Sequence, residues 1–355
     1  MKQTVMIDRL IKENQCFALY RLPLDDQIHF LRQHNNSPEF LFRVQDLEYS
    51  NRFVIAPFQI NAEHPIVLIT PDKEEMFPIP EDTVINEQDI TIDPSISKDY
   101  GHHFSVFLKA VKESRFRKLV LSRKKEIRKE LTFSAEDAFY TACRKYIYSY
   151  VYICHTPQTG TWLGCTPEIL LSERNKQWQT VALAGTQPLQ QGKLPDNWNE
   201  KNLEEQQMVS TYIQELLDSY QIQFTEKGPY TVRAGRLAHL KSDFHFALPD
   251  RYPIGNLLND LHPTPAVCGL PKEKAKQFIL ENEGYDRSYY SGFIGHLQPG
   301  ANSEIYVNLR CMQIHKHQLT LYAGGGILPS SSLEEEWQET ENKLQTMLTL
   351  TKTKC

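Results

Sequence analysis

The pattern of apolar and polar positions along the chain predicts a protein of mixed helices and strands. Apolar residues recur at helical spacing in five segments; the predicted helices are residues 98–114, 134–146, 199–220, 271–283 and 333–350. Shorter β-branched and aromatic runs between turn residues predict strands; these are residues 53–60, 65–70, 117–127, 150–156, 161–173, 178–186, 231–248, 289–297, 305–314 and 319–324. Because strands occur in runs rather than in regular alternation with helices, the pattern favours an α+β fold.

Two segments carry further local expectations. The three predicted strands between residues 150 and 186 are expected to form one antiparallel meander. Pro167 interrupts the middle one, so we expect a bend or a sheet edge at Glu168. Residues 71–94 are rich in Pro, Asp and Glu, which predicts an exposed linker or a long loop.

Composition and charge narrow the choice of partners. The 355 residues include 39 basic and 44 acidic side chains, for a formal net charge of −5, and 40% are apolar. This is ordinary globular composition, without a basic block for nucleic acid or the run of roughly 18 apolar residues that a membrane helix needs. The N-terminus lacks the apolar stretch of a signal peptide, and the seven cysteines form no C-x-x-C pair. We therefore expect a cytoplasmic protein that binds neither nucleic acid nor membrane.

One carboxylate falls on the apolar stripe of a predicted helix. In helix 199–220 the stripe includes Met208, Val209 and Ile213, and one turn earlier it reaches Glu205. A carboxylate there is either paired, hydrogen-bonded or bound to a cation, or it reaches water near a frayed helix start. The spacing leaves both alternatives open.

The last predicted helix and the segment before it offer a second polar cluster. Glu336, Glu339 and Lys343 lie along one flank of the helix, where they either hold a divalent cation and an anionic ligand or form a solvated ion pair. The preceding strand ends in Gly324–Gly326, whose amides either approach an anion or form a plain turn. The motifs of P-loops and of hydrolase nucleophile elbows are absent.

Three further features stand out against apolar surroundings. Lys118 begins strand 117–127, where it is either the wet end of the strand or a buried amine able to act as a base. Arg310 lies inside the predicted strand 305–314, where a guanidinium needs a carboxylate from the protein or from a ligand. The Pro-rich segment 262–272 is suited to a pocket wall or a rigid connector.

Taken together, these segments resemble the chorismate-utilising enzymes, which include the isochorismate, anthranilate, aminodeoxychorismate and salicylate synthases. Eight stretches match in the family's order; they are KLVLSR (118–123), LGCTPEILL (163–171), ALAGTQP (182–188), KNLEEQQMV (201–209), LHPTPAVCGLPK (261–272), ENEGYDRSYYSGFIG (281–295), VNLRCMQI (307–314) and AGGGILPSSSLEEEWQETENK (323–343). The resemblance implies an α+β fold of stacked antiparallel β-sheets with helices packed outside. It also implies a catalytic region at residues 96–355 and a variable, strand-rich region of the same fold at residues 1–95.

Within the family, two positions favour isochorismate synthase. Ala184 stands where aminodeoxychorismate-type enzymes carry a nucleophilic lysine, and Ala266 where the anthranilate and salicylate types usually carry threonine. The resemblance thus implies Mg²⁺-dependent isomerisation of chorismate to isochorismate, for menaquinone or siderophore synthesis, by a monomer or homodimer. The alternatives are a salicylate synthase, the large subunit of an anthranilate synthase, or a protein that binds chorismate without turning it over. Gln206 departs from the family pattern, because relatives often carry His there.

The resemblance also implies a role for each polar residue. Lys118 matches the general base that activates water for attack at C2, and Glu168 matches the general acid that protonates the departing C4 hydroxyl. As an acid, Glu168 has to keep a proton near neutral pH, so its pKa should be raised. Glu205 and Glu339 match the Mg²⁺ ligands, with Glu336 close enough to help. The residues expected to bind the substrate are Arg310, Lys343, Gly324, Gly325, Gly326, Thr186 and Ala266.

Overall fold

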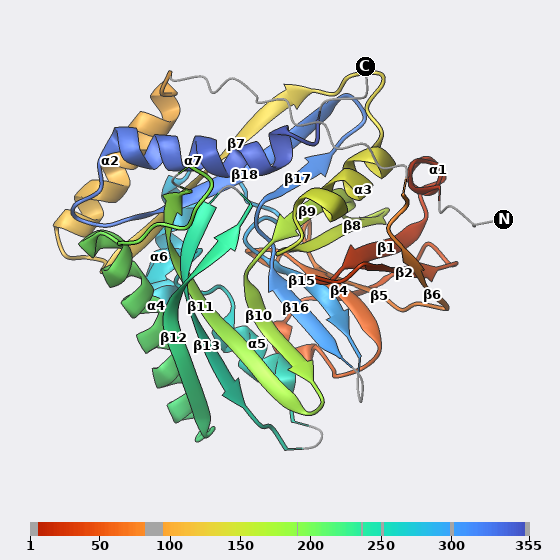
Figure 1. Ribbon diagram of the computed structural model, residues 1–355, viewed down its shortest axis with the longest axis horizontal. Helices are drawn as coiled ribbons and strands as arrows, with labels where there is room; N and C mark the ends of the chain where they lie inside the picture. Colours follow the sequence, from red (N-terminus) through yellow and green to blue (C-terminus); the bar gives the residue numbers. More distant parts are fainter. Residues whose placement is uncertain are drawn as a thin grey trace.

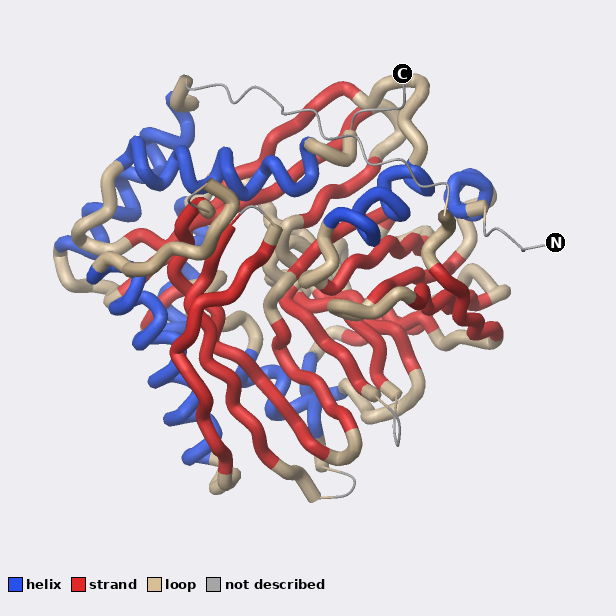
Figure 2. The backbone as a smooth tube through the Cα atoms, viewed as in Figure 1, coloured by secondary structure: helices blue, strands red, loops and turns tan. Residues whose placement is uncertain are grey.

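Two antiparallel β-sheets of nine strands each form the centre of the molecule, in a computed structural model that describes residues 6–81, 95–189, 191–235, 237–249, 252–298 and 302–351. The helices lie on the outer sides of the sheets (Figure 1). Figure 2 shows the same division by element type, with helices at the periphery and strands between them. The arrangement confirms the predicted α+β fold of stacked antiparallel sheets.

Each sheet contains strands from distant parts of the chain. The first sheet, in spatial order, consists of β14 (Gly269–Leu270), β7 (Lys118–Arg128), β18 (Gln318–Ile327), β17 (Cys311–Ile314), β9 (Gly160–Thr166), β8 (Tyr150–Thr156), β1 (Cys16–Arg21), β2 (Gln27–Gln33) and β6 (Lys73–Pro78). The second consists of β12 (Phe224–Ala234), β13 (Leu237–Phe246), β11 (Gln177–Pro188), β10 (Ile169–Arg174), β16 (Ser303–Val307), β15 (Phe293–Leu297), β4 (Arg52–Ala56), β5 (Ile66–Ile69) and β3 (Glu39–Leu41). Residues 71–94 were predicted to be a linker or a loop, but part of this segment is strand β6. Residues 82–94 lie outside the described residues.

The five helices predicted from the spacing of apolar residues are present, and the structure describes two others besides. They are α1 (Ile7–Lys12), α2 (Lys98–Lys112), α3 (Ala135–Lys145), α4 (Glu200–Ser219), α5 (Ile254–Leu261), α6 (Lys272–Asn282) and α7 (Leu333–Leu348), with a 3₁₀ turn, η1, at Val44–Asp46. Three of the described helices begin at side-chain caps: Asn199 accepts a hydrogen bond from the amide of Asn202 in α4, Ser332 accepts one from Glu335 in α7, and Ser134 accepts one from Asp137 in α3. Helix α4 packs on β11 and α7 on β18 (Figure 1). None of the helices that the structure describes is long and apolar enough to cross a membrane.

Two of the short breaks at which the chain crosses between the sheets carry predicted site residues. Strand β9 of the first sheet is followed by β10 of the second, with only Pro167 and Glu168 between them. Strand β16 of the second sheet is followed by β17 of the first, with residues 308–310 between them. The first crossing confirms the predicted bend at Glu168. Its cause is Pro167, since proline has no N–H with which to continue a ladder.

Two predictions about these segments were wrong. The strands between residues 150 and 186 do not form one meander: they form two hairpins, β8–β9 and β10–β11, in different sheets. Arg310 does not lie inside a strand either. Its φ of 47° is left-handed, a conformation that ends extended backbone. The spacing of apolar residues marks neither break, because apolar residues stand close before and after each of them. Only Pro167 indicated the first one.

The inner faces of the two sheets meet in an aromatic core. Tyr20 and Tyr150 come from the first sheet, and Phe53 and Tyr306 from the second. The rings of Tyr150 and Tyr306 stack with their centroids 4.4 Å apart. Three further apolar clusters fill the spaces between sheets and helices. Close packing on both sides of each sheet holds the two breaks, and the residues they carry, in fixed positions.

Candidate active site

A cavity lies where the two breaks meet α4, α7 and the end of β18. Most of the predicted site residues line it, namely Glu168, Thr186, Glu205, Ala266, Arg310, Gly324, Gly325, Gly326 and Lys343. The predicted site residues Lys118, Glu336 and Glu339 are not part of this lining, but each lies close to a glycine that is: Lys118 is close to Gly326, and the two glutamates are close to Gly325. The segment around Ala266 is a pocket wall, one of the two alternatives that its prolines left open.

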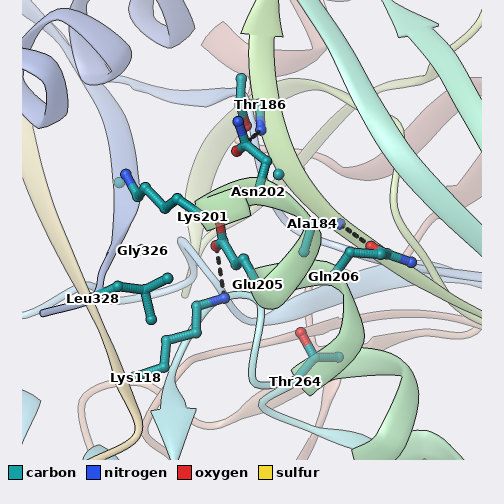
Figure 3. A network of polar contacts seen from close by, with 12 residues as sticks. Lys118, Ala184, Thr186, Lys201, Asn202, Glu205, Gln206, Thr264, Gly326 and Leu328 are labelled. Atoms are coloured by element: carbon teal, nitrogen blue, oxygen red, sulfur yellow. Dashed lines mark hydrogen bonds and ion pairs between the residues drawn. The ribbon is translucent and has the colours of Figure 1, made fainter. Parts of the chain in front are cut away.

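Lys118 and Glu205 form an ion pair at the edge of the cavity. Lys118 is the first residue of β7 and is completely buried, so it is not the wet end of a strand. Its Nζ lies 2.7 Å from Oε1 of Glu205, which α4 directs toward it (Figure 3). Burial opposes a charged carboxylate, but the ammonium outweighs it and lowers the pKa of Glu205 to about 2. Of the alternatives for Glu205, the structure therefore shows the paired carboxylate.

Glu168 is a buried carboxyl that forms no ion pair with the residues that the structure describes. It follows Pro167 in the break between β9 and β10, and only 2% of its surface is exposed. Thr264 donates a hydrogen bond to its Oε1 over 3.1 Å. Burial raises the pKa of Glu168 to about 7, against the opposing effects of this hydrogen bond and of more distant lysines. A proton retained near neutral pH is the property expected of a general acid.

Arg310 is a buried guanidinium that interacts with a neutral histidine instead of a carboxylate. Its Nη2 donates to Nε2 of His239 over 3.0 Å, and Nδ1 of His239 lies 2.9 Å from the carbonyl oxygen of Gly185. Burial and the neighbouring guanidinium lower the pKa of His239 to about 3, so its one hydrogen is on Nδ1. Within the described ranges, no carboxylate pairs with Arg310, and burial lowers the pKa of Arg310 to about 10. An anionic ligand would compensate this charge.

Three carboxylates surround the glycines of β18, and each is paired with a lysine. The pairs are Lys118–Glu205, Lys201–Glu336 and Lys343–Glu339. An added Cβ on Gly325 would lie 2.9 Å from Oε2 of Glu336 and 3.4 Å from Oε1 of Glu339, so only glycine leaves this approach open. Burial and the negative charge of Glu339 raise the pKa of Glu336 to about 7.

These carboxylates suit a hard divalent cation by the type of their donor atoms. Mg²⁺ prefers carboxylate oxygens together with water and substrate oxygens. The Oε2 atom of Glu336 is buried and, within the described ranges, makes no hydrogen bond, which leaves it available as a ligand. However, the part of the chain that the structure describes contains no ready cluster of three His, Cys, Asp or Glu side chains. Each lysine contacts the Oε1 atom of its carboxylate, and Mg²⁺ binding stays a prediction.

Comparison with known proteins identifies the family. A family model described as "Chorismate binding enzyme" matches residues 67–352. The chain belongs to this family. The match begins upstream of residue 118, where the first of the matching motifs starts.

Two curated relatives of this chorismate-binding enzyme are named isochorismate synthases. The chain is 28% identical to the vibriobactin-specific isochorismate synthase of Vibrio cholerae over 260 residues, and this match covers 71% of this chain and 66% of that protein. It is 32% identical to the isochorismate synthase EntC of Escherichia coli over 207 residues, and this match covers 56% of this chain and 53% of that protein. The matched part of the chain thus spans between half and two thirds of these relatives' length.

A solved structure confirms the fold of the family member. The menaquinone-specific isochorismate synthase MenF of Escherichia coli superposes with a TM-score of 0.78 at 21% identity, over 99% of this chain and 92% of that one. Strands β1, β2 and β6 pair into the first sheet and β3, β4 and β5 into the second, so residues before 95 contribute to both layers. The functional division at residue 95 stays a prediction.

Two residues of this site were missed by sequence reasoning. His239 lies on a predicted strand, but alternation alone does not tell which face of that strand looks into a cavity. Lys201 pairs with Glu336, which lies 135 positions away in the sequence, and no local pattern indicates such a contact.

Lys343 was predicted to bind substrate. In the structure it donates a hydrogen bond to the carbonyl oxygen of Gly324 over 2.7 Å and lines the cavity.

Proposed function

We propose that this chorismate-binding enzyme is an isochorismate synthase that uses Mg²⁺. The observation that carries the proposal is the pair of groups in one cavity: Arg310, a buried guanidinium with no carboxylate partner among the described residues, and Glu168, a buried carboxyl with a raised pKa. A chorismate molecule offers two carboxylates to the first and a departing hydroxyl to the second. The names of the curated relatives support the same reaction.

In the proposed reaction, one water molecule enters the ring and one leaves it. In this step Lys118 acts as a neutral amine, separated from Glu205 and with its ammonium proton passed to solvent, and it accepts a proton from water. The water oxygen bonds to C2, both conjugated double bonds of the ring shift, and the bond between C4 and its hydroxyl breaks. Glu168 donates a proton to that hydroxyl, which leaves as water, so the overall change is an isomerisation. The two residues approach the cavity from different elements, as acid and base acting at different carbons require.

The remaining residues are proposed to bind and orient the substrate. Arg310 and Lys343 pair with its carboxylates, and the amides of Gly324–Gly326 allow a close approach. Glu205 and Glu339, with Glu336, would hold Mg²⁺. When bound, this cation supplies positive charge that neutralises and positions the ring carboxylate.

The test is incubation of the purified protein with chorismate and Mg²⁺, with and without a chelator and ammonium, followed by chromatography. Isochorismate alone, lost on addition of chelator, is the expected product. Salicylate or anthranilate would assign the chain to one of those sister activities instead. Chorismate that binds but is not converted would refute the proposed enzyme and favour a binding protein.

A further inference from the structure

Strand β11 carries one wall of the cavity, and there its outer edge pairs with no strand of the described residues. On one side, β11 pairs with β13 along almost its whole length, from Trp178 to Pro188. On the other side, among the residues that the structure describes, β10 pairs with it only at residues 177–179. The residues that line the cavity, 183–186, lie beyond that point. Their outward N–H and C=O groups therefore need other partners.

The side chain of Gln206 on α4 provides the pairing that a neighbouring strand would provide. Its Oε1 accepts from the amide of Ala184 over 3.0 Å, and its Nε2 donates to the carbonyl oxygen of Ala182 over 3.1 Å. A residue of an adjacent strand bonds a carbonyl and an N–H of its neighbour in the same way. Gln206 is 2% exposed, so these bonds form away from water. Figure 3 shows the bond between the side chain of Gln206 and Ala184.

Asn202 repeats the arrangement one helical turn earlier. Its Oδ1 accepts from the amide of Thr186 over 3.0 Å (Figure 3). Residues four apart share a helix face, and residues two apart point their amides to the same strand edge, so the two side chains match two successive bonding positions. Gly185 lies between these positions with a φ of 73°, close against Asn202. The two amides thus hold β11 through an irregular stretch that an ordinary ladder would not follow.

We propose that Gln206, assisted by Asn202, is a positioning residue that sets the distance between the β11 wall and α4, and thereby the fit of the substrate. Glu205 sits beside Gln206 on the same helix and faces the same cavity. Any loosening of β11 therefore changes the spacing between Ala184 and this carboxylate. The effect on substrate rests on the proposed function, whereas the effect on the strand edge does not.

Amide hydrogen exchange of the unliganded protein tests the strand edge directly. In Gln206→Met, which keeps the size but loses the two hydrogen bonds to β11 and the two longer ones to the hydroxyls of Ser210 and Ser242, the amide of Ala184 should exchange at least about 10-fold faster. In Asn202→Ala the same acceleration should move to the amide of Thr186 and spare Ala184. Gln207→Met is the matched control, because Gln207 is exposed and bonds only to Thr211 within the described ranges. Unchanged exchange of Ala184 in Gln206→Met would overturn the proposal.

Steady-state kinetics with chorismate test the consequence for substrate. Gln206→Met should raise KM about 10-fold with a much smaller change in kcat, and Gln207→Met should change neither. A KM equal to that of the unmodified protein, whatever happens to the unfolding temperature, would show that Gln206 is merely structural. If the unmodified protein does not convert chorismate, the proposed function fails while hydrogen exchange still decides the role of Gln206. If Gln206→Met does not fold, Asn202→Ala decides both points, through Thr186 exchange and KM.

Discussion

Replacement of Glu168 by glutamine tests the chemistry of the site most directly. The substitution keeps the size of the side chain and an oxygen that can accept the hydrogen bond of Thr264, but it removes the transferable proton. With an ordinary pKa of 4.5, a carboxyl is protonated in about 0.3% of molecules at pH 7, whereas a pKa of about 7 keeps about half of them protonated. Burial thus increases the fraction of usable acid roughly 150-fold at neutral pH.

Two results are expected from this variant. Glu168→Gln should lower turnover of chorismate by roughly 100-fold or more, because general acid catalysis typically contributes that much. The unmodified protein should lose activity as the pH rises through about 7, since Glu168 then loses its proton. The assay is chromatographic measurement of isochorismate between about pH 6 and pH 9 with saturating chorismate and Mg²⁺.

Stability measurements separate this loss from misfolding. Because the folded-state pKa of Glu168 is raised, its contribution to stability is complete below its ordinary pKa of 4.5 and is lost as the pH rises through about 7. Glutamine has no charge to bury, so Glu168→Gln should unfold at a higher temperature than the unmodified protein on the alkaline side of pH 7. Near-normal turnover in the variant, or activity of the unmodified protein that does not fall above pH 7, would refute the reasoning.

Three more predictions concern the proposed base Lys118, the hydrogen bond of Thr264 to Glu168, and the glycine beside Lys118. Lys118→Ala should lower kcat roughly 100-fold or more with an unchanged circular dichroism spectrum, and retained turnover would remove Lys118 as the base. Thr264→Val removes a donor that stabilises the charged form of Glu168, so the pKa of Glu168 should rise and the alkaline loss of activity should move to higher pH. Gly326→Ala would place a Cβ 2.9 Å from Cε of Lys118 and should abolish activity, whereas Gly101→Ala, with ordinary contacts, should leave kcat unchanged; equal activity in both would contradict the packing argument.

Local patterns in the sequence were sufficient to predict most helices and strands. The five predicted helices are present as α2, α3, α4, α6 and α7, because each has an apolar face at helical spacing. The resemblance to chorismate-utilising enzymes placed nine predicted residues around what proves to be one cavity. Pro167 indicated the break at Glu168, since proline ends a ladder. At the break that contains Arg310, no proline indicated the end of a strand.

The protonation states and pairings of the site depend on contacts between distant residues. Spacing placed Glu205 on an apolar stripe but could not identify Lys118, 87 positions earlier, as its partner. The raised pKa of Glu168 follows from burial between two sheets, which no local pattern reports. The same holds for the neutral His239 beside Arg310 and for the bonds of Gln206 to β11.

Neighbouring residues in the sequence were enough to indicate the family, most of the element types and the chemical groups available to the site. Those properties depend on local periodicity and on motifs that neighbouring residues carry. Contacts between distant residues set which lysine neutralises which carboxylate, and they leave Arg310 with no carboxylate partner in the part of the chain that the structure describes. The physical reason is that electrostatic interactions depend on distance and burial in three dimensions, and two stacked sheets bring together residues more than a hundred positions apart.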